Sequence, residues 1–224
     1  MTGLTLAEEL LLLALNPETG RRYVNRRYLQ YGLAGASLAE LELQGRVAEA
    51  RGRVTVVNPL PPQDPLSSQI LASLLTPRGL RVRQWVRGTG RHVEELCLHR
   101  LVERGALRVD RRRFLGVFPY HRYPAAAEDW SAPVRGRYAE SVTAGFPDRR
   151  SRLLAAFTSA IGLASVLHPG FGSRGERGAL RILVREEWAP HAVYRAVQQD
   201  KKSGTSVSIG PDGGSDGGGG GGGD

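Results

Sequence analysis

The chain has 224 residues, of which 41% are hydrophobic, so it is long enough for one domain, or two small ones, with a substantial core. Its formal net charge is +9, and almost all of its basic residues are arginines, because the only lysines are Lys201 and Lys202. This balance predicts an anionic partner, namely nucleic acid, anionic lipid or an acidic protein, and a single cysteine, Cys97, excludes an internal disulfide.

The first predicted elements are two helices rich in leucine and alanine. Thr5-Leu6-Ala7-Glu8 is a capping box before an apolar run, so a short and largely buried helix is expected here. A second helix is expected from Asn25 to Gln44, ended by Gly45. Gly32 and Gly35 lie inside it, and each costs up to about 1 kcal/mol relative to alanine. We therefore expect another element to pack closely against the helix at these glycines.

The middle of the chain combines a hairpin with helices. Short strands over Val47–Ala50 and Val54–Val57 form the predicted hairpin. Three helices are expected to follow it, over Leu66–Leu75, Leu80–Arg87 and Arg91–Arg104.

A second hairpin is predicted after these helices. Its strands are expected near Leu107–Val109 and Phe114–Phe118, with a turn that carries Asp110 and three arginines. Residues from about Asp129 to Gln198 have the pattern of helices again.

The end of the chain differs in composition from the rest. From Lys201 onward the sequence is mostly Ser, Gly and Asp, which cannot offset the entropy cost of ordering. We therefore predict a folded domain over residues 1–198 and a disordered tail over residues 199–224. The fold class is mainly α, a compact helical domain with two short β-hairpins, of which one protrudes and is apolar and basic.

Motifs for catalysis or metal binding are weak. The segment Gly170–Gly175 has the spaced glycines of a dinucleotide-binding loop, but that loop follows a strand and the preceding segment here has a helical pattern. His92 and His99 are seven residues apart without an evident third ligand. Cys97 lies between two leucines, as a small core residue does. We expect a protein that is not an enzyme and that uses no metal and no cofactor.

The second hairpin places apolar side chains beside arginines. This combination suits the boundary of an anionic bilayer, where aromatic side chains enter and arginines meet headgroups. The alternative is that one face of the hairpin packs on the core. No stretch approaches the roughly 20 apolar residues of a spanning helix, so we expect a cytoplasmic protein, peripheral at the inner membrane surface. The residues of the predicted membrane or oligomer hairpin are Arg111, Arg112, Arg113, Phe114, Leu115, Val117 and Phe118.

Two other functions fit parts of the pattern. A helix over Arg91–Arg104 followed by an arginine-rich hairpin is also the order of a winged-helix protein, whose wing contacts DNA phosphates. Glu94, Glu95 and Glu103 on that helix would repel phosphate, which makes nucleic acid the less favoured partner. A homo-oligomer in which the hairpin pairs with a second subunit is the third hypothesis.

Several motifs occur in a fixed order along residues 4–124. They are Leu4–Leu13, Gly32–Gly35, Leu38–Leu41, Gly45-Arg46 and Leu101–Leu107. Their order and spacing resemble the Golgi phosphoprotein 3 family, whose eukaryotic members are adaptors that bind phosphatidylinositol 4-phosphate. The arginine bias is typical of a GC-rich genome and indicates a bacterial member. The resemblance implies a compact, mainly helical fold with a protruding apolar hairpin, here over residues 107–119.

The resemblance also implies a lipid pocket. Its four family positions fall on Asn25, Ala34, Arg91 and Glu94, and Arg91 keeps the family's arginine. Neighbouring arginines can add charge to such a site. We therefore predict a peripheral membrane protein that binds anionic or phosphorylated headgroups, similar to phosphatidylinositol 4-phosphate, through an arginine-rich surface and the hairpin. The expected headgroup-binding residues are Asn25, Arg26, Arg27, Arg87 and Arg91.

Overall fold

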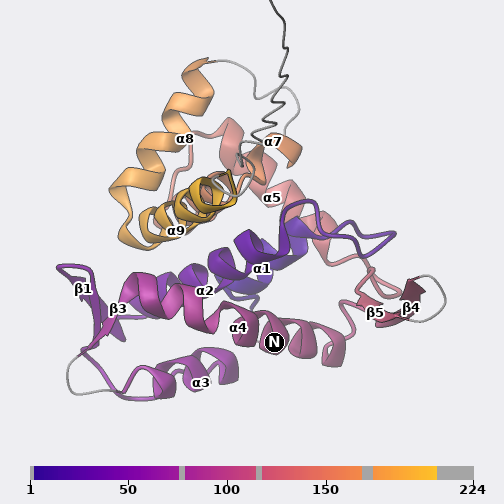
Figure 1. Cartoon of the computed structure of the whole chain (residues 1–224), viewed down its shortest axis with the longest axis horizontal. Helices are drawn as coiled ribbons and strands as arrows, with labels where there is room; N and C mark the ends of the chain where they lie inside the picture. The colour runs from indigo at the N-terminus through magenta and orange to yellow at the C-terminus, as the bar shows by residue number, and fades with distance from the viewer. Residues whose placement is uncertain (1–2, 76–78, 115–117, 168–173, 206–224) are drawn as a thin grey trace, which may run out of the picture.

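The computed structural model describes residues 3–75, 79–114, 118–167 and 174–205, and this part of the chain is mainly α, as predicted (Figure 1). The helices are α1 (Leu6–Ala14), α2 (Arg26–Leu43), α3 (Pro65–Ser73), α4 (Val82–Glu103), α5 (Ser131–Thr143), α6 (Arg149–Ala160), α7 (Ala164–Leu167), α8 (Arg174–Glu186) and α9 (Trp188–Thr205). The strands are β1 (Val47–Ala50), β2 (Arg53–Val56), β3 (Leu80–Arg81), β4 (Asp110–Phe114) and β5 (Phe118–Arg122).

The first two helices form the centre of the core. Helix α1 begins with the predicted capping box, in which the Thr5 hydroxyl accepts a hydrogen bond from the Glu8 amide, and all nine of its residues are buried. Helix α2 begins after Asn25, whose side-chain oxygen accepts a hydrogen bond from the Arg27 amide at 2.9 Å. It packs against α1, α4, α6 and α9, so its position fixes most of the helical body.

The glycines of α2 lie where neighbouring helices approach closely, as predicted. A Cβ atom added at Gly35 would be 2.5 Å from Val193 Cγ2 on α9, and one at Gly32 would be 2.9 Å from Ile161 Cγ2. Larger residues at these positions would push the helices apart, which accounts for glycine in spite of its low helix propensity.

An ion-pair network links α1, α2 and α6. Arg150 donates from Nη1 to Glu40 Oε2 at 2.9 Å, and from Nη2 to Glu9 Oε2 at 3.1 Å and to the Leu4 carbonyl oxygen at 2.8 Å. The Leu6 amide also donates to Glu40 Oε2, at 2.8 Å. Both glutamates are buried, so the arginine supplies the partner that a buried carboxylate requires.

The predicted helices Leu80–Arg87 and Arg91–Arg104 are in fact one helix, α4. Gly88 and Gly90 lie between the two predicted ranges, and the helix continues through both. A Cβ atom at Gly90 would be 2.6 Å from the Gln30 carbonyl oxygen of α2, so the missing side chain lets the two backbones meet. Packing against α2 thus outweighs the local cost of glycine. Leu80 lies in strand β3 before this helix.

The first predicted hairpin is confirmed and gains a strand. Strands β1 and β2 pair antiparallel, with Val47 opposite Val56, and β3 extends the sheet in the order β1-β2-β3. Arg53 of β2 lies directly opposite Arg81 of β3.

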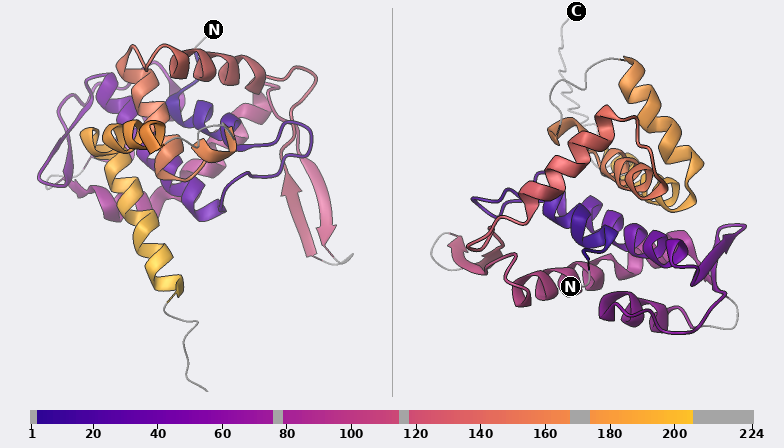
Figure 2. Two further views of the ribbon diagram at one scale, coloured as in Figure 1. Left: turned by 90° about the horizontal axis from the view of Figure 1, so that it is seen from above. Right: turned by 180° about the vertical axis from the view of Figure 1, so that it is seen from behind.

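The second hairpin exists, but the predicted register was wrong. Its strands are β4 and β5, with Asp110 opposite Arg122 and Arg111 opposite His121, so the three arginines lie in a strand and not in the turn. The ribbon projects from the helical body (Figures 1 and 2). Charged residues are tolerated on a two-stranded ribbon without a core beneath it, so apolar periodicity is a poor guide to its bounds. Leu115 and Val117 lie outside the described residues, as do the side chains of Arg113, Phe114 and Phe118.

The C-terminal helices pack above α2, and the last one is longer than predicted. Helix α9 continues to Thr205, past the predicted domain boundary at residue 198. Asp200 forms ion pairs with Arg27 and Arg87, which holds this last turn against α2 and α4. The predicted tail beyond residue 205 lies outside the described residues. Within the described residues, no helix is both long enough and apolar enough to cross a bilayer.

Replacing Gly90 and Gly88 separately tests the contact between α2 and α4. Gly90→Ala should lower the free energy of unfolding by about 1–3 kcal/mol, because the added Cβ meets the Gln30 backbone. Gly88→Ala is the matched control, since nothing lies within 4 Å of its Cβ position, and it should raise stability by up to about 1 kcal/mol. Urea unfolding monitored by circular dichroism measures both changes. Equal changes in the two variants would contradict the close contact.

Candidate functional site

A buried glutamate organises the arginines before and at the start of α2. The Glu94 side chain on α4 is fully buried and accepts from Arg22 Nη2 at 2.6 Å and Arg22 Nε at 2.9 Å on one oxygen. Its other oxygen accepts from Arg26 Nε at 3.0 Å and from Gln30 Nε2 at 2.8 Å. Glu94 is one of the four positions of the pocket that the resemblance implies, and two arginines meet there around its carboxylate. We call these four residues the Glu94 cluster.

A second cluster forms where α9 meets α2 and α4. Asp200 Oδ2 lies 2.9 Å from Arg27 Nε, and Asp200 Oδ1 lies 3.0 Å from Arg87 Nη2. The Tyr31 hydroxyl donates to Asp200 Oδ2 at 2.9 Å and accepts from Arg27 Nε at 2.8 Å. Burial is the main cause that raises the pKa of Tyr31, and the hydrogen bond to Asp200 raises it further. The hydrogen bond that Arg27 donates to Tyr31 raises the pKa of Arg27. We call these residues the Asp200 cluster.

The structure separates residues that the sequence grouped together. Arg26 and Arg27 are adjacent on α2 but belong to different clusters, because successive residues of a helix point in different directions. Asn25 is the N-cap of α2, so its side chain has a structural partner. Arg91 has a side chain that is 79% exposed and pairs with Glu95 Oε1 at 2.9 Å on the surface of α4.

A depression of about 660 Å³ connects the Glu94 cluster to the hairpin. Arg22 and Arg26 line it together with Tyr120 and His121 of β5, and α4 contributes both apolar and acidic side chains. The predicted headgroup residue Arg26 and the predicted membrane hairpin therefore share one surface feature, the α4–β5 depression. Its lining residues are Arg22, Arg26, Glu95, Leu98, His99, Val102, Glu103, Val109, Tyr120, His121 and Tyr123.

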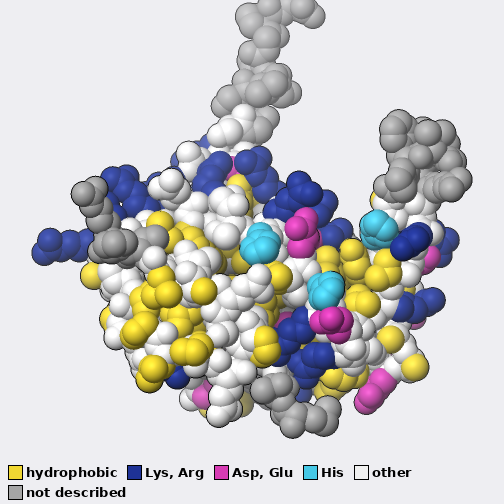
Figure 3. Space-filling model, turned by 90° about the horizontal axis from the view of Figure 1, so that it is seen from below, with side chains coloured by type: hydrophobic (Ala, Val, Ile, Leu, Met, Phe, Trp, Pro, Cys, Tyr) yellow, Lys and Arg dark blue, Asp and Glu magenta, His cyan; other side chains and the backbone are white. Residues whose placement is uncertain are grey.

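The hairpin and the Asp200 cluster lie toward the same side of the molecule. In Figure 2 the β4–β5 ribbon and the C-terminal end of α9 project in the same direction, and Asp200 lies in the last turns of α9. Figure 3 shows Lys and Arg side chains gathered along the side toward which the ribbon projects. Arg27 remains accessible there, since 63% of its side chain is exposed in spite of its ion pair.

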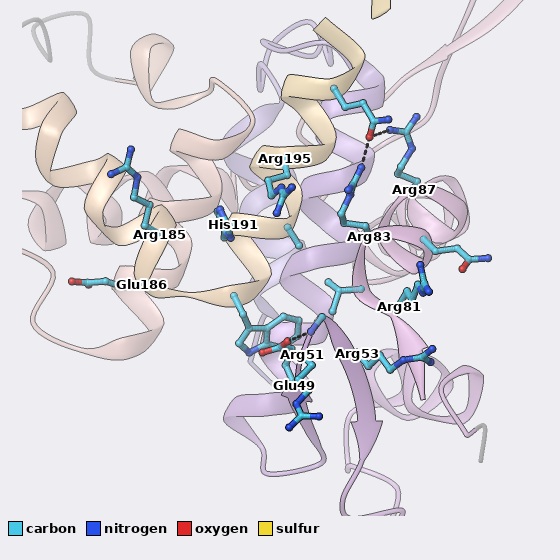
Figure 4. Close-up of a pocket in the computed structure, with 16 residues that line it drawn as sticks. Glu49, Arg51, Arg53, Arg81, Arg83, Arg87, Arg185, Glu186, His191 and Arg195 are labelled. Carbon is cyan, nitrogen blue, oxygen red and sulfur yellow. Dashed lines mark hydrogen bonds between the residues drawn. The ribbon is translucent and has the colours of Figure 1, made fainter. Parts of the chain in front are cut away.

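A second hollow was not predicted from the sequence. It measures about 830 Å³ and lies between the β1–β3 sheet with the start of α4 on one side and α8 with α9 on the other (Figure 4). Arginines from all of these elements line it, and of the predicted headgroup residues only Arg87 is among them. Nothing in the local sequence indicates this groove, because its residues come from two stretches of the chain, 49–87 and 185–199, that are far apart in the sequence.

The residues considered for catalysis or metal binding lie in environments that do not favour either role. Cys97 is fully buried, and burial raises the pKa of its thiol, which keeps the reactive thiolate form scarce. His99 Nδ1 lies 3.2 Å from Glu103 Oε2 on the same exposed helix face. Within the described ranges, His, Cys, Asp and Glu side chains do not gather in groups of three or more that could hold a metal ion. Of the glycine-rich segment, residues 170–173 lie outside the described residues.

The comparisons with known proteins agree with the resemblance in the sequence. None of the curated proteins matches the chain. The profile of a family described as Golgi phosphoprotein 3 (GPP34) matches residues 6–199, from the first residue of α1 into the C-terminal part of α9. Because this match covers most of the chain and the whole helical body, the protein belongs to the Golgi phosphoprotein 3 (GPP34) family.

Proposed function

We propose that this protein is a peripheral membrane protein that binds anionic or phosphorylated lipid headgroups and catalyses no reaction. The observation that carries the proposal is the α4–β5 depression, where Arg22 and Arg26 line the same hollow as Tyr120 and His121 of the projecting hairpin. A basic site next to a projecting ribbon can hold a headgroup while the ribbon reaches the bilayer surface.

The exposed arginines on this side add attraction that does not depend on one pocket. Each basic residue near an anionic surface contributes about 1 kcal/mol, and the contribution falls off within a Debye length of about 8 Å at physiological salt. Arg27 and Arg91 keep most of their side chains exposed. Their carboxylate partners, Asp200 and Glu95, partly neutralise them, so a phosphate has to compete for the same guanidinium groups.

The hairpin offers the features of an interfacial ribbon. Arg111 and Arg112 are exposed on β4, and Arg112 pairs with Asp110 at 2.9 Å. Arg122 lies over the ring of Tyr120, with its guanidinium carbon 5.4 Å from the ring centre. Aromatic rings held next to arginines suit the headgroup region, where one end of a side chain is wet and the other apolar.

Nucleic-acid binding has less support. The helix beside the hairpin, α4, presents Glu95 and Glu103, whose side chains are more than half exposed. Both line the α4–β5 depression, where they would repel a closely spaced row of phosphates. A single headgroup held by Arg22 and Arg26 can avoid them more easily than a polymer can.

Neutralising Asp200 should strengthen binding to membranes. Asp200→Asn keeps the size of the side chain but removes the charge that pairs with Arg27 and Arg87. One extra positive charge near the surface is worth about 1 kcal/mol, or roughly a fivefold higher affinity for vesicles that contain a phosphorylated anionic lipid. The same change should lower the free energy of unfolding by about 1–3 kcal/mol, since hydrogen bonds to a charged group are lost. Vesicle sedimentation and thermal unfolding measure the two effects.

If Asp200→Asn bound such vesicles no better than the unchanged protein, while remaining folded at the assay temperature, the Asp200 cluster would not face the membrane. Vesicles of neutral lipid are the control, because the extra charge should add nothing there.

Reversing one charge on the hairpin tests its role at the membrane. Arg111→Glu should weaken binding to anionic vesicles by about 1–2 kcal/mol, which is roughly 5- to 30-fold. Arg181→Glu is the matched control, since Arg181 is equally exposed but lies on α8, away from the hairpin (Figure 1). Screening by salt should limit the effect of the control to about twofold. Similar losses in both variants would show that net charge alone, and not the hairpin, drives binding.

A further inference from the structure

The groove of about 830 Å³, here called the arginine groove, is separate from the α4–β5 depression, and Arg87 is the residue that it shares with the Asp200 cluster. It lies near β1, β2 and β3, at the opposite end of the molecule from the β4–β5 hairpin (Figures 1 and 4). Its lining residues are Glu49, Arg51, Gly52, Arg53, Arg81, Val82, Arg83, Gln84, Arg87, Arg185, Glu186, Trp188, His191, Ala192, Arg195 and Gln199.

The arginine groove carries an excess of positive charge. Seven arginines line it, against two glutamates and one histidine. Arg87 is paired with Asp200, and Glu49 accepts a hydrogen bond from the Gly52 amide. Within the described residues, five of the seven arginines have no carboxylate at ion-pair distance, and they are Arg51, Arg81, Arg83, Arg185 and Arg195.

The fold holds two of these arginines in a position that costs stability. Arg53 and Arg81 are directly opposite each other in the antiparallel β2–β3 pair, so their side chains leave the sheet on the same face. Like charges directly opposite each other destabilise such a pair. Arg81 is also the N-cap residue of α4, and its guanidinium, which has only donors, cannot accept a hydrogen bond from the free amides there. Arg53 Nη1 donates to the Gly79 carbonyl oxygen at 3.2 Å, and an anion bound beside Arg81 would offset the repulsion between the two like charges.

Other groove residues are held in place by the fold. On α9, residues 188, 191, 195 and 199 share one helix face, because they are spaced by three or four positions. The indole nitrogen of Trp188 donates to Glu42 Oε1 at 2.8 Å, and Gln199 accepts from Arg87 at 3.2 Å and also from Arg83. The wall from α9 is therefore fixed relative to α2 and α4 before any ligand binds.

We propose that the arginine groove binds a compact ligand with two or more phosphate groups, either a free molecule or a multiply phosphorylated headgroup. Guanidinium groups hold phosphate oxygens with paired hydrogen bonds, and several are needed to balance several phosphates. The volume lies within the range of about 300–1,000 Å³ that is usual for small-molecule sites. A bounded hollow with arginines on both walls fits a compact polyanion better than a long polymer.

Titration of the full-length protein with inorganic tripolyphosphate tests this proposal. Isothermal calorimetry at about 150 mM salt should show binding at least 10-fold tighter than for orthophosphate. Arg81→Gln and Arg195→Gln, on opposite walls, should each weaken binding about 3- to 10-fold. Arg181→Gln, an exposed arginine of α8 outside the groove, should change it less than twofold. Absence of tripolyphosphate binding, or equal losses in all three variants, would overturn the proposal.

Thermal unfolding separates a binding role from a structural one. Without ligand, Arg81→Gln should leave the midpoint unchanged or raise it, because it removes the repulsion from Arg53. Saturating tripolyphosphate should raise the unfolding midpoint of the wild-type protein by more than it raises that of Arg81→Gln. The proposal would be overturned if Arg81→Gln had a lower midpoint than the wild-type protein without ligand and if tripolyphosphate raised both midpoints equally. Arg81 would then have only a structural role.

Further titrations identify the source of the phosphates and the competing partners. If vesicles with a multiply phosphorylated headgroup lose affinity in Arg81→Gln and are displaced by tripolyphosphate, the site serves a lipid. If tripolyphosphate binds but the affinity for such vesicles does not depend on Arg81, the site serves a free molecule. Either of these two outcomes supports the proposal. A short oligonucleotide or acidic peptide that binds through Arg81 and resists displacement by tripolyphosphate would overturn it. Arg111→Glu should leave tripolyphosphate binding intact, so failure of the hairpin proposal is detected independently.

Discussion

Buried ion pairs between glutamates and arginines hold the helices together and also determine the charge of the surface. Glu9 and Glu40 meet Arg150 where α1, α2 and α6 join, and Glu94 meets Arg22 and Arg26 where α2 and α4 join. A carboxylate without a partner in such places would be costly. Because these glutamates are buried in the interior, they do not offset the positive charge of the surface. The resulting excess of arginine on the surface is the physical basis of both proposed anion sites.

The position of α2 connects this interior to the surface. Gly35 and Gly90 allow α9 and α4 to approach the helix closely, and the same approach brings Asp200 and Arg87 to Arg27. The hairpin is attached to the end of α4, so the direction in which it projects depends on how α4 packs on α2 (Figure 1). Membership of the Golgi phosphoprotein 3 family is shown by the family profile, whereas the binding of a lipid headgroup by this surface is our proposal.

The sequence predicts local features of the fold correctly. It does not predict the features that depend on contacts between distant segments. The capping box at Thr5 and the packing glycines of α2 each depend on residues within one turn or on one missing side chain. The continuity of α4 depends on the backbone of Gln30, about 60 positions away. The hairpin register was misplaced because a ribbon without a core beneath it lacks the apolar alternation that marks a strand. The arginine groove combines four segments and has no local signature.

Hydrogen exchange of the full-length protein, with and without vesicles that contain a phosphorylated anionic lipid, tests the membrane proposal most directly. We predict slower exchange on vesicles for the peptides over the β4–β5 hairpin and the first turn of α2, because β5 and the start of α2 line the α4–β5 depression and β4 is paired with β5. Exchange in α5 should stay the same, because α5 lies along the opposite edge of the molecule from the projecting hairpin (Figure 2). Unchanged exchange in the hairpin and α2, together with slower exchange in α5, would contradict the proposed orientation on the membrane.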